Sequence, residues 1–414
     1  MNLSEVKKIA ESRDIYLWGA RRLGFSTLNS FTREGMTVKG FLDSSPDIQG
    51  KFIQGQPVFS PNDILSKPTD QSFIIITAGL YVSEISNACN ESGFIHKKDF
   101  IAAHELQRLD YLIDVSGSCN LKCISCPRGN MRNHPEAGFM RAETFEKVLS
   151  KIIKEDPLTG AVGLYIFGEP LLNTELPEII KICNDNGILA SVSSNLNIRK
   201  SFVETIKARP AWFRVSTSGF GASYEVTHTG GKWDLFLKNL HNLRDWREEY
   251  NPDMDVEVFY HLYKDRTDDY KKMAELCGEL NFTLRVCHAA LMPLDNINSI
   301  ITGEPLTKEA RKTILLQTLK SDEAIEMAKK TKEFPCNFLR CLPITWNTKI
   351  LKCSCWYDPG HILSNVDYLE TPLEEIIKLR KDCDLCKMCK ERAIHRYMLM
   401  YIDDNIVHER NKLT

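Results

Sequence analysis

The sequence has no long apolar run and no excess of one charge. None of its apolar stretches approaches the roughly 20 residues that a membrane-spanning helix needs. The first residues, Met1 to Lys8, lack the apolar core of a signal peptide. Its 53 basic and 55 acidic residues give a net charge of −2, so no electrostatic field favours nucleic acid or an anionic membrane surface. We therefore expect a cytoplasmic protein that binds neither.

Cysteine is the residue that departs from an ordinary globular composition. The chain has 414 residues, of which 43% are apolar and 14 are cysteine, and this length predicts two to four domains. Most cysteines are bunched into residues 119–126 and 336–389, which in a long chain favours metal binding over disulfides. Four others stand singly among apolar neighbours and are expected to be inert core thiols: Cys89, Cys183, Cys277 and Cys287.

Three cysteines follow directly on the apolar run 111–115. Cys119, Cys123 and Cys126 are separated by three and then two residues, on a predicted loop after a strand. Soft thiolates on a short loop can converge on a four-iron cluster, and three ligands leave one iron open to bind a reactive molecule. A structural zinc site or three separate buried thiols are the alternatives.

The spacing of this triplet resembles the signature of the radical S-adenosylmethionine (SAM) superfamily. Residues 137–146 are similar to the segment before the first barrel helix of that family, and residues 164–172 to its second strand, which ends in a Gly-Glu motif. Many members have an aromatic residue before the third cysteine, where this chain has Ser125.

The resemblance implies a chemistry and a set of site residues. The open iron would chelate SAM, whose reductive cleavage yields a 5′-deoxyadenosyl radical that abstracts hydrogen from a substrate. The residues implied beside the SAM amino group are Gly168, Glu169 and Pro170, and those implied near its ribose and carboxylate are Asn195, Ser216 and Ser218. A serine at a strand end is also a common turn former, so both roles are open for the two serines.

From about residue 110 to 300, apolar strands alternate with helical stretches, which is typical of βαβ units and a parallel sheet. The expected strands are residues 111–115, 164–167, 189–193, 212–216, 256–260 and 283–287. Six strands fit the partial TIM-like (β/α)6 barrel that the resemblance implies. Ligands of parallel α/β folds bind at the carboxyl ends of strands. His261 and His288 fall there, either as acids or bases in a substrate pocket or as ordinary hydrogen-bonded residues.

Residues 1–104 have the order of a Rossmann half: strand, glycine turn, helix, strand and acidic residue. The expected strands are 15–18, 38–42 and 73–77. Arg21 occupies the place of the second glycine, so ordinary NAD binding is not expected. The segment resembles Rossmann-like domains attached to sugar-modifying enzymes and C-methyltransferases of polysaccharide pathways. Arg21 and Arg22 either hold a phosphate or nucleotide group at the helix start, or the domain serves packing or partner contact.

A charged amphipathic helix is expected over residues 306–334, before seven cysteines in the 54 residues 336–389. This region resembles the SPASM or shortened twitch extension of radical SAM enzymes, which binds one or two auxiliary 4Fe–4S clusters. The resemblance assigns one auxiliary cluster to Cys341, Cys353, Cys383 and Cys386. Cys336, Cys355 and Cys389 are alternative ligands of the same cluster. Zinc at the same thiolates is the alternative.

The sequence thus predicts a three-module α/β protein: a Rossmann-like domain (1–104), a radical SAM partial barrel (105–305), and a linker helix with an auxiliary-cluster domain (306–414). The resemblance implies an oxidoreductase that uses SAM, a radical SAM 4Fe–4S cluster, one auxiliary 4Fe–4S cluster with two as the alternative, and an external electron donor such as flavodoxin or ferredoxin. The expected substrate is a small molecule, a sugar or nucleotide sugar that undergoes oxidation, dehydration or epimerisation. Modification of a ribosomally made peptide, and a non-catalytic iron–sulfur or zinc protein that binds a partner, are the alternatives.

Overall fold

The computed structural model describes residues 1–130, 136–356 and 359–402, and the chain divides into two compact units. Unit 1 comprises Met1–Leu109, Leu149–Val162 and Cys183–Leu189, and unit 2 comprises Asp110–Val148, Gly163–Ile182 and Ala190–Thr414. The division into three modules at residues 104 and 305 stays a prediction. Among the described residues, none of the helices combines the length and the apolar character that a bilayer requires of a spanning segment.

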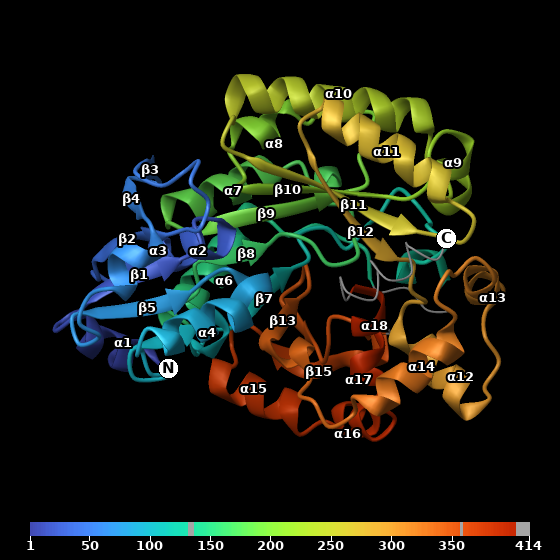
Figure 1. Cartoon of the computed structure of the whole chain (residues 1–414). Helices are drawn as coiled ribbons and strands as arrows, with labels where there is room; N and C mark the ends of the chain where they lie inside the picture. Colours follow the sequence, from blue (N-terminus) through green and yellow to red (C-terminus); the bar gives the residue numbers. More distant parts are fainter. Residues whose placement is uncertain (131–135, 357–358, 403–414) are drawn as a thin grey trace. The chain divides into compact units, whose positions relative to one another are not determined.

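In the described part of unit 1, six strands form one sheet in the order β3-β4-β2-β1-β5-β6 (Figure 1). β1 pairs in parallel with β2 and with β5, so the first strand lies in the middle, as in a doubly wound Rossmann sheet. The strands are β1 (Asp14–Trp18), β2 (Val38–Leu42), β3 (Phe52–Ile53), β4 (Gln56–Phe59), β5 (Ser72–Ile76) and β6 (Phe100–Ala102). The helices of residues 1–109 are α1 (Leu3–Ala10), α2 (Arg22–Arg33), α3 (Pro61–Leu65) and α4 (Val82–Glu91).

The apolar run of β5 shows why this sheet is covered on both faces. Phe73 and Ile75 belong to a core cluster with Leu28 and Phe31 of α2, whereas Ile74 and Ile76 belong to a second cluster with α4. Because successive strand residues point to opposite faces, a continuous apolar run fits a strand buried on both sides.

A second sheet contains nine strands among the described residues, in the order β12-β11-β10-β9-β8-β7-β13-β14-β15. Its strands from β7 to β12 form the parallel part, and the sheet does not close into a full barrel in the described residues. The strands are β7 (Asp110–Ile113), β8 (Ala161–Gly163), β9 (Leu189–Ser194), β10 (Trp212–Thr217), β11 (Asp255–Leu262), β12 (Thr283–His288), β13 (Cys341–Ile344), β14 (Lys349–Leu351) and β15 (Ile362–Asp367).

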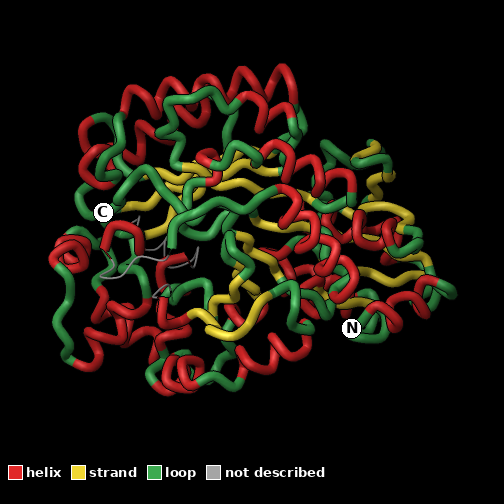
Figure 2. Tube along the Cα trace, turned by 180° about the vertical axis from the view of Figure 1, so that it is seen from behind, coloured by secondary structure: helices red, strands yellow, loops and turns green. Residues whose placement is uncertain are grey.

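Helices α10 and α11 lie along one side of β10 to β12, and the same layers appear from behind in Figure 2. The other described helices follow in chain order: α5 (Pro127–Asn130), α6 (Ala142–Glu155), α7 (Leu176–Asp185), α8 (Val203–Lys207), α9 (Ala222–Thr227), α10 (Trp233–Tyr250), α11 (Thr267–Glu279), α12 (Leu294–Thr302), α13 (Lys308–Leu315), α14 (Ser321–Lys330), α15 (Leu373–Lys381), α16 (Asp384–Glu391), α17 (Ile394–Tyr397) and α18 (Leu399–Ile402).

Two predicted elements were wrong. The second barrel strand is β8, Ala161–Gly163, and residues 164–169 form a loop, because the Glu169 N–H donates to the Ser118 carbonyl at 2.8 Å rather than to a strand neighbour. The expected helix over residues 306–334 is two helices, α13 and α14. It breaks where the Lys264 N–H donates to the Leu316 carbonyl at 2.9 Å.

Candidate functional site

The cysteine triplet and the Gly-Glu segment line one cavity of about 1150 Å³ at the carboxyl ends of the parallel strands. The loop between β7 and α5 contributes the three cysteines. The sequence-predicted residues that line this cavity are Cys119, Cys123, Cys126, Gly168, Glu169, Asn195, Ser216 and Ser218. Pro170 is buried at the start of a short 3-10 helix and is not among the lining residues.

The cysteine loop is held in place by the segment after α9. The Lys122 N–H donates to the Thr229 carbonyl at 3.0 Å, and the Ile124 N–H donates to the Thr227 carbonyl at 3.1 Å. The Asn195 side-chain amide lies 3.7 Å from the Cys119 sulfur. These contacts fix the loop backbone so that its three thiols face one cavity.

Burial governs the protonation of the triplet thiols. It raises the pKa of Cys119 to about 12 and that of Cys126 to about 11, so both are protonated near pH 7 in the free chain. Their ionisation there would need a positive partner, such as a metal ion, to offset the lost hydration. Within the described residues, no three cysteine, histidine or carboxylate side chains are arranged closely enough to hold a single metal ion.

Glu169 is a buried carboxylate that orients the neighbouring strand end. Its side chain is 2% exposed and accepts the backbone N–H groups of Asn195 at 2.8 Å and Leu171 at 3.1 Å. Burial raises the pKa of this carboxyl group to about 7, although these hydrogen bonds lower it. Glu169 therefore fixes the position of Asn195 beside the cysteine loop.

Ser218 is hydrogen-bonded to other residues of the cavity wall. Its hydroxyl donates to the Thr227 hydroxyl at 2.8 Å and lies 3.2 Å from Nδ1 of His228. The His228 ring stacks on the Tyr224 ring with centroids 4.4 Å apart. Burial, with a smaller contribution from His261, lowers the pKa of His228 to about 3, so this ring is neutral near pH 7. Sequence reasoning missed His228, because a single histidine in a loop carries no distinguishing pattern.

The two predicted histidines are placed differently. His261 lines the cavity, and burial followed by the charge of Arg214 lowers its pKa to about 4. His288 is 1% exposed and is not among the lining residues. Of these two predicted histidines, His261 therefore lines the cavity of the cysteine triplet, together with His228, and His288 does not.

Arg214 is a lining residue that sequence reasoning did not single out. Its guanidinium lies 4.5 Å from the ring centroids of both Trp212 and Phe259, and its Nε donates to the Glu257 carboxylate at 3.1 Å. Arg285 lies 4.0 Å from the same carboxylate. Two guanidinium groups against one carboxylate leave a net positive charge beside the cavity. The sequence does contain a signal for Arg214: it lies two residues before Ser216 and therefore on the same face of the predicted strand.

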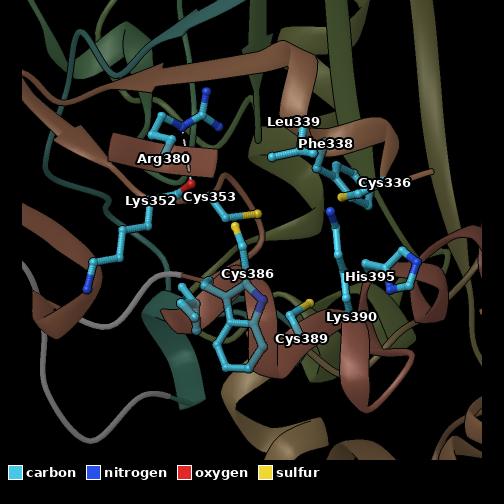
Figure 3. Close-up of a pocket in the computed structure, with 12 residues that line it drawn as sticks. Cys336, Phe338, Leu339, Lys352, Cys353, Arg380, Cys386, Cys389, Lys390 and His395 are labelled. Atoms are coloured by element: carbon cyan, nitrogen blue, oxygen red, sulfur yellow. Dashed lines mark hydrogen bonds between the residues drawn. The ribbon is translucent and has the colours of Figure 1, made fainter. Parts of the chain in front are cut away.

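A second cavity, of about 380 Å³, lies among the C-terminal cysteines of unit 2. Cys336, Cys353, Cys386 and Cys389 line it, and Figure 3 shows their sulfur atoms around a common hollow. Two members of the predicted auxiliary set, Cys353 and Cys386, are thus present. The other two, Cys341 and Cys383, are not among the lining residues. Cys341 begins β13, and Cys383 is the N-cap residue of α16.

A buried cation accompanies these thiols. Arg380 is 2% exposed and donates to the carbonyls of Cys341 at 2.6 Å and Lys352 at 3.2 Å. Desolvation lowers its pKa, and the nearby cysteine thiolates oppose that shift. The hydrogen bond with Cys355, assisted by the Arg380 charge, lowers the pKa of the lining thiol Cys353 to about 7, whereas burial raises the pKa of Cys389 to about 12.

No family profile matches the chain. It is 29% identical over 109 residues to the 7,8-dihydro-6-hydroxymethylpterin dimethyltransferase of Methanocaldococcus jannaschii, and 31% identical over 99 residues to a probable GTP 3′,8-cyclase of Methanococcus maripaludis. These segments cover 26% and 23% of this chain but only 21% and 32% of the relatives' own lengths.

Solved structures align with this chain at low identity. SuiB of Streptococcus suis bound to the precursor peptide SuiA has 13% identity and a TM-score of 0.46 over 76% of this chain and 80% of that one. BtrN in complex with AdoMet and 2-DOIA has 15% identity and a TM-score of 0.42 over 72% and 92%. The native anSMEcpe structure with bound AdoMet has 14% identity and a TM-score of 0.44 over 68% and 82%.

Proposed function

We propose that this protein is a radical SAM enzyme that cleaves SAM reductively and uses the resulting radical to abstract hydrogen from a sugar or nucleotide sugar, leading to oxidation, dehydration or epimerisation. The observation that carries the proposal is the shared cavity, where Cys119, Cys123 and Cys126 face Gly168 and Glu169. These cysteines would hold a 4Fe–4S cluster, which when bound supplies the electron that cleaves SAM.

The residues around the triplet would bind and orient SAM. Gly168 leaves room for the cysteine loop, because a Cβ at this position would lie 1.5 Å from the Ser116 carbonyl oxygen. The Glu169 carboxylate accepts the backbone N–H of Asn195 and so fixes the position of Asn195. We assign Asn195, Ser216 and Ser218 to the ribose and carboxylate of SAM. Pro170 would fix the turn after Glu169 rather than touch SAM, since it lies outside the lining.

The charge beside the cavity supports an anionic substrate group such as the diphosphate of a nucleotide sugar. Arg214 lines the cavity, and its carboxylate partner Glu257 is shared with Arg285, so positive charge is in excess. Guanidinium groups match phosphate oxygens in charge and geometry. His261, neutral near pH 7, would give or accept a proton at a ring nitrogen that faces the substrate.

We further propose one auxiliary 4Fe–4S cluster in the second cavity. The four cysteines that line it, Cys336, Cys353, Cys386 and Cys389, are our proposed ligands in preference to Cys341 and Cys383. A fully ligated cluster there would accept the electron that a substrate radical loses on becoming an oxidised product. The first electron would come from an external donor such as flavodoxin or ferredoxin. A cytoplasmic location stays a prediction.

Anaerobic turnover tests the proposal. The reconstituted, reduced protein is incubated with SAM and, in separate reactions, with deuterated nucleotide sugars or deuterated peptides, and 5′-deoxyadenosine is analysed by mass spectrometry. We expect SAM cleavage, with deuterium transfer from at least one nucleotide sugar. Cys123→Ala, the matched control, should abolish cleavage.

Three outcomes would contradict parts of this proposal. Absence of SAM cleavage in a protein with full iron content would leave the non-catalytic partner-binding alternative. Cleavage equal in wild type and Cys123→Ala would exclude the triplet. Deuterium transfer from a peptide but from no nucleotide sugar would replace the sugar substrate with a peptide.

A further inference from the structure

Unit 1 contains a polar cavity that the proposed reaction does not use. Its volume is about 1060 Å³, and it is lined by α2, the β3–β4 hairpin, α6 and the turn after α7. All of its lining residues belong to unit 1: Leu28, Asn29, Thr32, Arg33, Gln54, Gln56, Ile153, Asp185, Asn186 and Gly187. Amide side chains are therefore the commonest polar groups of this wall.

Arg33 is a lining residue whose guanidinium group is fixed by the chain itself. Its Nη2 donates to the carbonyls of Pro157 at 2.7 Å and Thr159 at 2.6 Å. Its Nε and Nη1 are buried, so a molecule in the cavity does not reach them. Arg33 therefore contributes charge to this wall, and the hydrogen bonds to a ligand would come from other side chains.

The amides around Arg33 are available for a ligand. The side chains of Asn29, Gln54 and Gln56 make no hydrogen bond to any other residue that the structure describes. An amide both donates and accepts, as a hydroxyl group does. Several amides on one wall therefore complement a ligand with many hydroxyl groups better than they complement an apolar ligand or a simple ion.

The charge balance of the wall favours a neutral ligand. Arg33 is opposed by Asp185 across the same lining, and the acidic groups of Glu34 and Asp156 also act on its guanidinium. A phosphate or carboxylate site is expected to have an excess of cations, and this wall has none. Leu28 and Ile153 add apolar surface that suits the C–H face of a sugar ring.

We propose that unit 1 binds a neutral saccharide in this cavity, with the amides of Asn29, Gln54 and Gln56 donating to its hydroxyl oxygens. This proposal does not rest on the proposed function, since it holds for any reaction in the partial barrel. Saccharide binding is measured without SAM or reductant, so its failure is distinct from a failure of SAM cleavage.

The test is a binding titration of the full-length reconstituted protein by saturation-transfer NMR. The neutral probes are glucose, galactose, mannose and N-acetylglucosamine, and the anionic probes are glucuronate and inorganic phosphate. We expect at least one neutral probe to bind saturably. Its Kd should rise about tenfold or more in the double variant Asn29→Ala/Gln56→Ala, which loses two hydrogen bonds.

Two further variants separate binding from folding. Gln54→Ala removes a third amide from the lining and should also weaken binding. Asn90→Ala replaces an exposed amide at the end of α4, outside the lining, and should bind the probe as wild type does. No saturable binding of any neutral probe, binding of anions alone, or an unchanged Kd in the double variant would each overturn the proposal.

Discussion

Gly168 lies directly against the carbonyl oxygen of Ser116: a Cβ added to Gly168 would come within 1.5 Å of that atom and 3.1 Å of an Asp114 carboxylate oxygen. No side chain can enter such a gap without moving backbone. Because Gly168 has no side chain, the loop that carries Glu169 can pack directly against the loop that carries Cys119.

Gly168→Ala should displace one of these two loops and strongly reduce SAM cleavage, by tenfold or more, because small shifts of positioned groups are costly in catalysis. The measurement is 5′-deoxyadenosine formation together with iron content. Gly278→Ala is the matched control, because the space around Gly278 in α11 is open. It should leave cleavage unchanged and stabilise the helix by about 1 kcal/mol. Wild-type cleavage by Gly168→Ala would show that this contact does not position the site.

Cys336→Ala should lose the auxiliary cluster, whereas Cys341→Ala should keep it, because Cys336 lines the second cavity and Cys341 does not. Iron and sulfide analysis with Mössbauer spectra of the reconstituted proteins provides the measurement. About four irons per chain should be lost in the first variant, as expected for one 4Fe–4S cluster. The reverse pattern would restore the ligand set assigned from the resemblance, with Cys341 and Cys383.

Arg214→Gln should raise KM for a nucleotide-sugar substrate roughly 10- to 100-fold, since a charge-assisted hydrogen bond contributes about 1.5–3 kcal/mol. Steady-state kinetics of product formation give KM. Arg285→Gln is the control, because Arg285 shares the partner Glu257 but is not among the lining residues. Its KM should stay within about threefold of wild type. A similar rise in both variants would mean that the shared ion pair, not the Arg214 charge in the cavity, sets substrate affinity.

The buried His228 makes the fold less stable in acid. Its pKa falls from 6.5 to about 3 on folding, chiefly through burial. The unfolded chain therefore takes up a proton below pH 6.5 that the folded chain refuses. Relative to acid conditions, the folded chain therefore has its full stability above pH 6.5, and its free energy of unfolding decreases as the pH falls from 6.5 toward 3. Between pH 7.5 and 5.5, this group alone should lower the free energy of unfolding by about 1.4 kcal/mol.

Urea unfolding of wild type and His228→Gln at both pH values measures this contribution. The drop between pH 7.5 and 5.5 should be about 1.4 kcal/mol smaller in the variant. An identical drop in the two proteins would mean that His228 is protonated to the same extent in the folded and unfolded chains.

Three of the six strands of the unit 1 sheet, β1, β2 and β5, were predicted to within one residue, and the short strands β3, β4 and β6 were not predicted. Val38–Leu42 matches exactly, because apolar residues in a short run bounded by turn residues leave few alternatives. The prediction of a strand at residues 164–167 failed for a tertiary reason. Tyr165 and Phe167 have strand propensity, but Glu169 is drawn to Ser118, and the loop lines the cavity instead.

The site was predicted where its signal is local in sequence. The spacing of Cys119, Cys123 and Cys126 and the Gly-Glu pair are such signals, and the structure brings these residues to one cavity. Contacts between strands have no local pattern in the sequence. The pairing of Arg214 with Glu257, for example, depends on the register of β10 and β11. The choice among the seven C-terminal cysteines likewise depends on how α16 packs.

The pairing of β13 with β7 has a practical consequence for anyone who shortens this chain. Cys341 to Ile344 lie in parallel register with Asp110 to Ile113, the strand that leads into the cysteine loop. Removing everything after residue 305 would uncover one edge of β7 and leave its peptide groups open to another chain. A truncated barrel of this kind should aggregate. Mixing it with the missing C-terminal piece should restore solubility, because β13 would again pair with the exposed edge of β7.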